Sequence, residues 1–253
     1  MAALAIWWCA NALQALVLVR ALARGFVTKY PIFYAYLSYV LLESLLRFYV
    51  YAAHPSLYQP FYWYTQLISV AVGCGVILEI YRRALANYPG AARMAQCLLL
   101  IIFLAVVCKA ILNGLSGPVW SPAKTMAELE RNLRTVQAVL LLAMLGVLSY
   151  YAIPVGRNLR GIIWGYALFI GTSVISLTIR SHLPDNAQAW WQYIQPVTYL
   201  ISLVIWCVAL WSYRPNPPLE TKSELQRDYQ SLAAGTARVL AHVRGYLERV
   251  VRS

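Results

Sequence analysis

The chain has 253 residues, of which 61% are apolar and only 12% are charged, too few polar side chains to cover a soluble domain of this size. Its formal net charge is +12, but the basic residues lie in short clusters between apolar segments, which argues against a nucleic-acid-binding surface. The composition therefore predicts a membrane protein.

Seven apolar segments are long enough to cross a bilayer, which takes about 20 helical residues. They cover residues 2–20, 31–53, 61–81, 95–116, 130–152, 161–180 and 190–212. Prolines stand at most of their edges, and only Pro196 is expected inside a segment. We predict an all-α, polytopic membrane protein: a seven-transmembrane-helix bundle over residues 1–213 whose first segment is a retained helix, not a cleaved signal peptide.

The distribution of Lys and Arg predicts the orientation of this bundle, because basic connections stay on the cytoplasmic side. With the N-terminus outside and the C-terminus in the cytoplasm, 15 of the 21 Lys and Arg residues fall inside and four fall outside. Tryptophans and tyrosines near the segment ends fit interfacial belts. We expect a multi-pass protein of the bacterial inner membrane or of another membrane that faces the cytoplasm.

The second segment carries Glu43 and Arg47, four residues apart and therefore on one helix face, where they can form an ion pair. This pair is either a buried ionic brace or part of a binding site, because ionisable groups within a bilayer are costly and often functional. Near the inner end of the third segment, Glu79 precedes Arg82 and Arg83, and we expect an interfacial ion pair there.

The fourth segment holds Lys109 and Asn113, and no acidic residue stands four positions from Lys109. Lys109 either extends to the membrane surface, pairs with Glu43, or lines a cavity that opens outward. In the fifth segment, Thr125 and Glu128 have the spacing of a capping box, which predicts a helix that begins outside the bilayer.

We predict that the polar side chains of the outer half gather in a basic pocket with an aromatic rim, suited to an anionic or amphiphilic small molecule or to a lipid head group. The candidate ligand-binding residues are Glu43, Arg47, Lys109, Asn113, Arg134, Gln137, Gln192 and Gln195.

The sixth segment contains Gly161 and Gly165 in a GxxxG spacing, which predicts close packing against a neighbouring helix. After the seventh segment, a proline-rich exit leads into a cytoplasmic tail, residues 214–253. Its apolar residues recur four and three apart, as in a coiled coil or an amphipathic helix. The candidate partner or oligomer contacts are Leu225, Tyr229, Leu232, Val239, Val243, Tyr246 and Val250.

Three interpretations of this tail stay open: it self-associates or binds a protein partner as a coiled coil, it lies on anionic lipid, or it packs beneath the bundle. The five cysteines are scattered among apolar residues, so no disulfide framework is expected.

The segments contain no catalytic constellation, and the three histidines His54, His182 and His242 fall outside them, so we expect neither an enzyme nor a bound cofactor or metal.

Three functions remain as hypotheses. The first is a sensor or receptor-like bundle whose outward pocket acts on a cytoplasmic helix. The alternatives are a transporter or permease for a small anionic or amphiphilic solute, and a non-catalytic accessory or scaffold subunit of a membrane complex.

Overall fold

The computed structural model describes residues 2–116, 122–151, 153–179, 185–214 and 230. These residues form long α-helices, one 3-10 turn and connections, without any strand in the described ranges. The elements are α1 (Ala2–Ala23), η1 (Phe26–Thr28), α2 (Pro31–Ala53), α3 (Pro55–Ala84), α4 (Pro89–Ser116), α5 (Pro122–Tyr150), α6 (Arg157–Ile179) and α7 (Asp185–Ala209).

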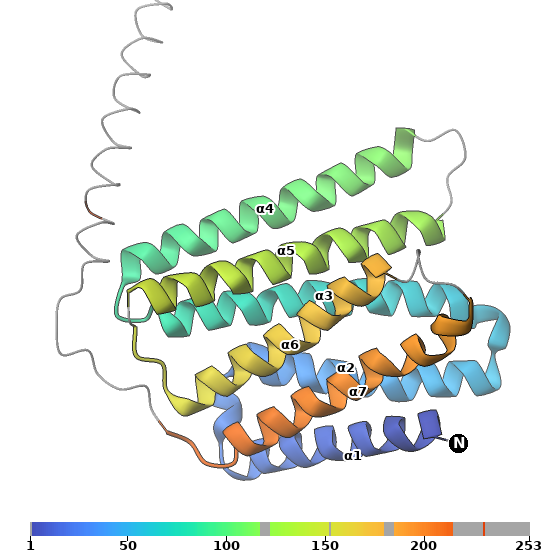
Figure 1. Ribbon diagram of the computed structural model, residues 1–253, viewed down its shortest axis with the longest axis horizontal. Helices are drawn as coiled ribbons and strands as arrows, with labels where there is room; N and C mark the ends of the chain where they lie inside the picture. The colour runs from blue at the N-terminus through green and yellow to red at the C-terminus, as the bar shows by residue number, and fades with distance from the viewer. Residues whose placement is uncertain (1, 117–121, 152, 180–184, 215–229, 231–253) are drawn as a thin grey trace, which may run out of the picture.

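Figure 1 shows these helices lying side by side along one common direction, with α4 at one edge of the bundle and α1 at the other. The helix α4 packs against α5 and α3, whereas α1 packs against α7 and α2. Between these edges, α3 contacts α2, α5 and α6, and α6 packs along α7. The buried core therefore lies where α2, α3, α5, α6 and α7 meet.

Four helices contain stretches long and apolar enough to cross a membrane, as far as the described residues are concerned: Leu4–Ala23, Pro55–Ala84, Leu129–Tyr150 and Arg157–Ser176. Many of their large apolar side chains face outward; Val19, Leu22 and Leu142 are each more than 60% exposed. Apolar surface of this extent is compatible with an integral membrane protein, because lipid can cover it.

The other three long helices, α2, α4 and α7, contain no stretch among their described residues that meets both the length and the hydropathy of a span, so the predicted count of seven spans and its orientation stay predictions. The helix α2 includes Glu43, Arg47 and five tyrosines, and the apolar parts of α4 and α7 are the shorter Ala92–Val106 and Tyr193–Ala209.

Prolines stand at the starts of most helices. The first residue of a helix has no partner for its N–H within the helix, so proline, which has no N–H, fits this position well. Pro31, Pro55, Pro89 and Pro122 are the first residues of α2, α3, α4 and α5. The predicted edge at residue 31 is confirmed, whereas α3, α4 and α5 begin before the predicted segments 61–81, 95–116 and 130–152. The expectation for Pro60 was wrong: it lies inside α3, because this helix already begins at Pro55.

The predicted N-cap at Thr125 was also wrong, because α5 begins at Pro122 and places Thr125 inside the helix. The helix begins ahead of its described apolar stretch, Leu129–Tyr150, and the expectation that it begins outside the bilayer stays a prediction.

Close packing of α6 on α7 confirms the prediction made from the GxxxG spacing. A methyl group added at Gly161 would collide with the side chain of Ala209, and one at Gly165 would collide with the indole of Trp206. Because glycine has no side chain, the backbones approach closely and Trp206 becomes fully buried. The Trp206 ring meets Phe33 edge to face, at a centroid distance of 5.2 Å, and stacks with Tyr166 at 6.5 Å.

The seven predicted tail contacts, from Leu225 to Val250, lie outside the described residues. The described chain leaves α7 at Ala209 and continues to Arg214, and the predicted boundary between bundle and tail stays a prediction.

Candidate functional site

Two ion pairs with the same spacing lie on neighbouring parts of the bundle. On α2, Arg47 pairs with Glu43, as the sequence predicted. On α5, the Nε of Arg134 lies 2.8 Å from an Oε of Glu130. Glu43, Glu130 and Arg134 are at most 7% exposed, so these charges are held inside the bundle. A carboxylate and a guanidinium buried together offset much of each other's desolvation cost.

A glutamine on α3 joins the two pairs. The side-chain oxygen of Gln66 accepts a hydrogen bond from Arg47 at 3.0 Å, and its nitrogen donates to Glu130 at 2.6 Å. Thr65 on the preceding position also accepts from Arg47, at 2.9 Å. We call these six residues the charge network: Glu43, Arg47, Thr65, Gln66, Glu130 and Arg134. It links α2, α3 and α5, and its formal charge is zero.

The two arginines of the network differ in how many of their donors are used. Arg47 forms an ion pair with Glu43 and donates hydrogen bonds to Thr65, Gln66 and the backbone oxygen of Tyr62. Its guanidinium also lies over the Tyr62 ring at 4.3 Å. Its side chain is 18% exposed. With four acceptors around it, Arg47 is held as a brace.

Arg134 is 5% exposed, and its Nε donates to Glu130. Its two terminal amino groups, Nη1 and Nη2, have no hydrogen-bond acceptor among the described side chains. Aromatic rings surround it: the Phe169 ring lies 5.4 Å from the guanidinium carbon, and Tyr36 and Tyr166 are close enough to interact with it electrostatically. Arg134 is therefore a buried cation with a pair of donors left over.

The rings around Arg134 come from three helices and contact one another. Tyr36 of α2 meets Tyr166 of α6 edge to face, with centroids 5.7 Å apart, and Phe169 of α6 lies 5.2 Å from Tyr199 of α7. Tyr36, Tyr166 and Phe169 are buried, and Tyr199 is partly buried. These four rings and Arg134 form what we call the arginine site, where α2, α5, α6 and α7 converge.

Gln137 lies three residues after Arg134 on α5 and is 1% exposed. Its Nε2 donates to the backbone oxygen of Val70 at 2.9 Å and contacts the Cys74 sulfur at 3.3 Å. Its Oε1 is buried without a hydrogen-bond donor among the described residues. These bonds fix α5 to α3 one helical turn from Arg134, so Gln137 supports the arginine site by holding α5 in place.

Gln195 lies on α7 and donates to Ser173 of α6 at 3.4 Å, one helical turn from Tyr199. The hydroxyl of Tyr199 donates to Gln14 of α1 at 2.9 Å. The structure thus places Gln195 at the α6–α7 side of the arginine site. The side chains of Asn113 and Gln192, also predicted for the pocket, lie outside the part that the structure describes.

Lys109 does not join the charge network. It lies on α4 at the edge of the bundle, and its side chain is exposed. No ion pair or hydrogen bond connects it to the network within the described residues. The structure therefore separates the predicted residues into Glu43, Arg47, Arg134 and Gln137 inside the bundle and Lys109 on its outer surface.

A second polar region, the capping cluster, lies at the other end of the helices and holds backbone groups. An Oε of Glu79 accepts the N–H of Phe33 at 2.8 Å, in the first turn of α2, and Arg83 lies 3.9 Å from the Glu79 carboxylate. The predicted ion pair of Glu79 is confirmed, and its position at the membrane interface stays a prediction. Burial raises the pKa of Tyr30, which precedes α2, to about 12, with a smaller contribution from Tyr213.

The same cluster fixes the end of α7. Asn158 of α6 donates to the backbone oxygens of Ala209 and Ser212, at 3.0 and 2.8 Å, and its own oxygen accepts the N–H of Arg214 at 2.7 Å. Arg20 of α1 donates to the Trp211 oxygen at 2.7 Å and lies over the Trp211 ring at 3.7 Å.

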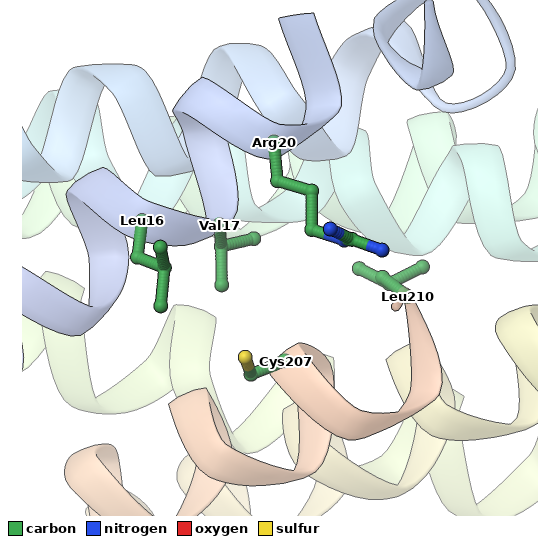
Figure 2. A pocket seen from close by; sticks show the side chains of 5 residues that line it. All are labelled: Leu16, Val17, Arg20, Cys207 and Leu210. Atoms are coloured by element: carbon green, nitrogen blue, oxygen red, sulfur yellow. The ribbon is translucent and has the colours of Figure 1, made fainter. Parts of the chain in front are cut away.

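A small cleft between α1 and α7 adjoins this cluster (Figure 2). It is lined by Leu16, Val17, Arg20, Cys207 and Leu210, and its volume is about 10 Å³, enough for roughly one water molecule. Because Arg20 is bonded to Trp211, the cleft offers no free charged group to a larger ligand. The described residues also contain no group of three or more His, Cys, Asp or Glu side chains that would hold a metal ion.

Sequence reasoning missed Glu130 and Gln66. Glu130 had a usable signal, since it stands four residues before Arg134 as Glu43 stands before Arg47. Gln66 had none, because its bridging role depends on how α3 is rotated between α2 and α5.

No protein-family model matches the chain, and comparison with curated proteins and with solved structures gives no match either.

Proposed function

We propose that this protein is an integral membrane receptor or sensor that binds a small anionic molecule at the arginine site. One observation carries the proposal: Arg134 is 5% exposed, yet among the described residues only its Nε has an acceptor. Among the described residues, Nη1 and Nη2 have no acceptor and are not among the fully enclosed unpaired atoms, so a bound group can complete their hydrogen bonds. An anion would supply them, and the aromatic rings would enclose its apolar part.

The binding group of this proposal is Arg134, not Arg47 or Lys109. Arg47 already has four partners, and Lys109 faces away from the bundle on α4. Glu43 supports the site through the charge network, and Gln137 on α5 supports it through its bond to the Val70 oxygen on α3. Gln195 would complete its side near α7, and the role of Gln192 stays a prediction outside the described side chains.

A signal has a route out of this site along α7. Tyr199 lies at the arginine site, and ten residues later the end of the same helix is held by Asn158 and Arg20, just before the tail. A ligand that tilts or rotates α7 would therefore change these bonds and move the tail. Such a shift requires that the ligand bind one helix arrangement more tightly than the other.

For the topology, we propose seven spans with the N-terminus outside and the C-terminus in the cytoplasm. Support comes from the basic side chains exposed at the end of the bundle that contains the α1–α2, α3–α4 and α5–α6 connections, among them Arg24, Lys29, Arg82 and Arg160. In a variant without its native cysteines, a membrane-impermeant maleimide should label Ser56→Cys in intact cells. It should label Ala86→Cys only after permeabilisation, and the reverse pattern would invert the topology.

The binding proposal is tested by native mass spectrometry of the gently extracted protein. A small molecule should stay with the wild type and with Arg131→Lys, whose side chain is exposed on the same helix, but not with Arg134→Lys. Arg134→Lys keeps the charge opposite Glu130 and removes the paired donors. Equal retention by both variants would rule out the arginine site.

Transport of the same anion is a second candidate, favoured by the position of the site at the meeting point of four helices and beside two buried carboxylates. Membrane-embedded carboxylates often carry protons in transporters. Proteoliposomes separate the two functions, since a transporter accumulates the labelled solute and a receptor binds it without flux.

A further inference from the structure

The chemistry of the arginine site restricts the class of ligand, and we infer that it binds a small monocarboxylic acid with a planar, apolar body. This inference rests on the proposed function and makes it more specific. It combines three features of the site: the donors that remain on Arg134, the charge already present around it, and the kind of surface that encloses it.

The unused donors of Arg134 suit a carboxylate. Its Nε is occupied by Glu130, which leaves Nη1 and Nη2 side by side at the end of the planar guanidinium. Two parallel N–H groups match the two oxygens of one carboxylate, and paired bonds of this kind are short and directional. A halide or another single-atom anion would use the pair less well.

The surrounding charge favours a single negative charge on the ligand. The charge network contains two carboxylates and two guanidinium groups, so it is already balanced. Glu130, which is 7% exposed, stands beside Arg134, and Glu43 lies across the same network. A dianion such as a phosphate monoester would place two more charges near these carboxylates in a site of low dielectric constant, where repulsion is strong. A monocarboxylate adds only one.

The walls of the site favour a planar, apolar body. Phe169 covers the guanidinium at 5.4 Å, and the Tyr36–Tyr166 and Phe169–Tyr199 contacts present ring faces and edges within 6 Å of each other. A flat ring can lie among such side chains in the offset or edge-to-face geometries that aromatic groups prefer. A flexible alkyl chain would gain the apolar contact without these geometries and would lose more conformational freedom.

The test uses the full-length protein in nanodiscs of phosphatidylcholine and measures its thermal midpoint with four probes: benzoate, benzyl alcohol, phenyl phosphate and octanoate. Benzoate at a hundredfold excess over its Kd should raise the midpoint by about 5 °C, as expected for a ligand that binds only the folded state. Benzyl alcohol and phenyl phosphate should leave it unchanged, and octanoate should bind at least tenfold more weakly than benzoate.

Two variants and one matched control assign the effect to the site. Benzoate affinity should fall at least tenfold in Arg134→Lys and stay at the wild-type value in Arg131→Lys. If Arg134→Lys does not fold, Phe169→Leu provides the same test, because it removes the ring over the guanidinium and leaves Arg134 with Glu130. Its benzoate affinity should fall several-fold.

The outcomes separate this inference from the function on which it rests. Phenyl phosphate binding that requires Arg134 would overturn the monocarboxylate and keep the anion site. Octanoate binding that equals or exceeds benzoate binding would overturn the planar body and point to a fatty-acid-like ligand. If none of the anions shifts the midpoint and no molecule is retained in native mass spectrometry, both proposals fail.

Discussion

The two polar regions of the bundle, the charge network and the capping cluster, stabilise the fold in different ways. In the capping cluster, Glu79, Asn158 and Arg20 bond to backbone groups at the ends of α2 and α7. Such partners are fixed by the helices themselves, since helix ends always leave N–H and C=O groups unpaired. In the charge network, side chains bond mainly to other side chains across α2, α3 and α5.

The difference indicates where the molecule can change. Arg47 lies about 20 Å along α2 from Phe33 at about 1.5 Å per residue, so the two regions occupy different levels of the bundle. A helix cap has one satisfied arrangement. A network of buried charges can exchange partners, and Arg134 already has donors to spare. We therefore place binding in the charge network and structural anchoring in the capping cluster.

The largest effect is expected for Glu130→Ala, which leaves Arg134 buried without its counter-ion. Removing one partner of a buried ion pair typically costs about 3–5 kcal/mol. Chemical denaturation in detergent should show this loss. The double variant Glu130→Gln/Arg134→Gln should recover most of it, because no uncompensated charge remains; a double variant less stable than Glu130→Ala would contradict the pairing.

A smaller effect is expected for Asn158→Ala in the capping cluster. This change removes donors to two backbone oxygens near the end of α7 and should cost about 2 kcal/mol. Benzoate affinity per folded molecule should change by no more than about threefold, because the arginine site keeps all its contacts and Asn158 acts on it only through α7. A large loss of affinity in this variant would mean that the two regions are not separate in function.

Glu43→Gln should cost less than the loss of Glu130, about 1 kcal/mol, although both residues are equally buried. Arg47 keeps Thr65, Gln66 and the Tyr62 oxygen as acceptors, and it is partly exposed. The comparison of Glu43→Gln with Glu130→Gln, measured by the same denaturation, therefore reports how fully each arginine is paired. A greater cost at Glu43 would contradict the assignment of Arg47 as a brace.

The smallest effect concerns pH and Tyr30 in the capping cluster. Its pKa is raised to about 12 in the folded protein, mainly by burial, and is about 10 in an unfolded chain. The folded state therefore favours the neutral phenol, and the stability from this preference is present below pH 10 and lost between pH 10 and 12.

At pH 11 the loss from Tyr30 amounts to about 1 kcal/mol. The wild type should lose this much more stability than Tyr30→Phe when the pH rises from 9 to 11, and denaturation curves at both values measure the difference. Identical pH dependence in the two proteins would show that Tyr30 titrates normally.

Sequence periodicity and proline positions were enough to predict the long helices, because a buried or lipid-facing helix needs a long apolar run and Pro31, Pro55, Pro89 and Pro122 fit its first turn. The predicted helix starts were wrong where polar residues extend a helix beyond its apolar part. Pro60 and Thr125 both became interior positions for this reason.

The two ion pairs within single helices were predictable from the sequence, and the hydrogen bonds that join the helices were not. The spacing of Glu43 and Arg47 fixes a common face on one helix, and the same rule applies to Glu130 and Arg134. Contacts between helices depend on rotation about each helix axis. The sequence gives the level of Lys109 along α4 but not its direction, and nearly all sides of α4 are apolar, so the placement of Lys109 on the outer surface required the structure.

The central claim is that an anion binds directly to Arg134, and the most direct measurement is to locate one there. Crystals of the protein grown with 4-bromobenzoate would place the bromine by its anomalous scattering. Our account predicts a single bromine among Tyr36, Phe169 and Tyr199, with the carboxylate on Nη1 and Nη2 of Arg134. A bromine found only on the lipid-facing surface, with Arg134 still bonded to Glu130 alone, would contradict it.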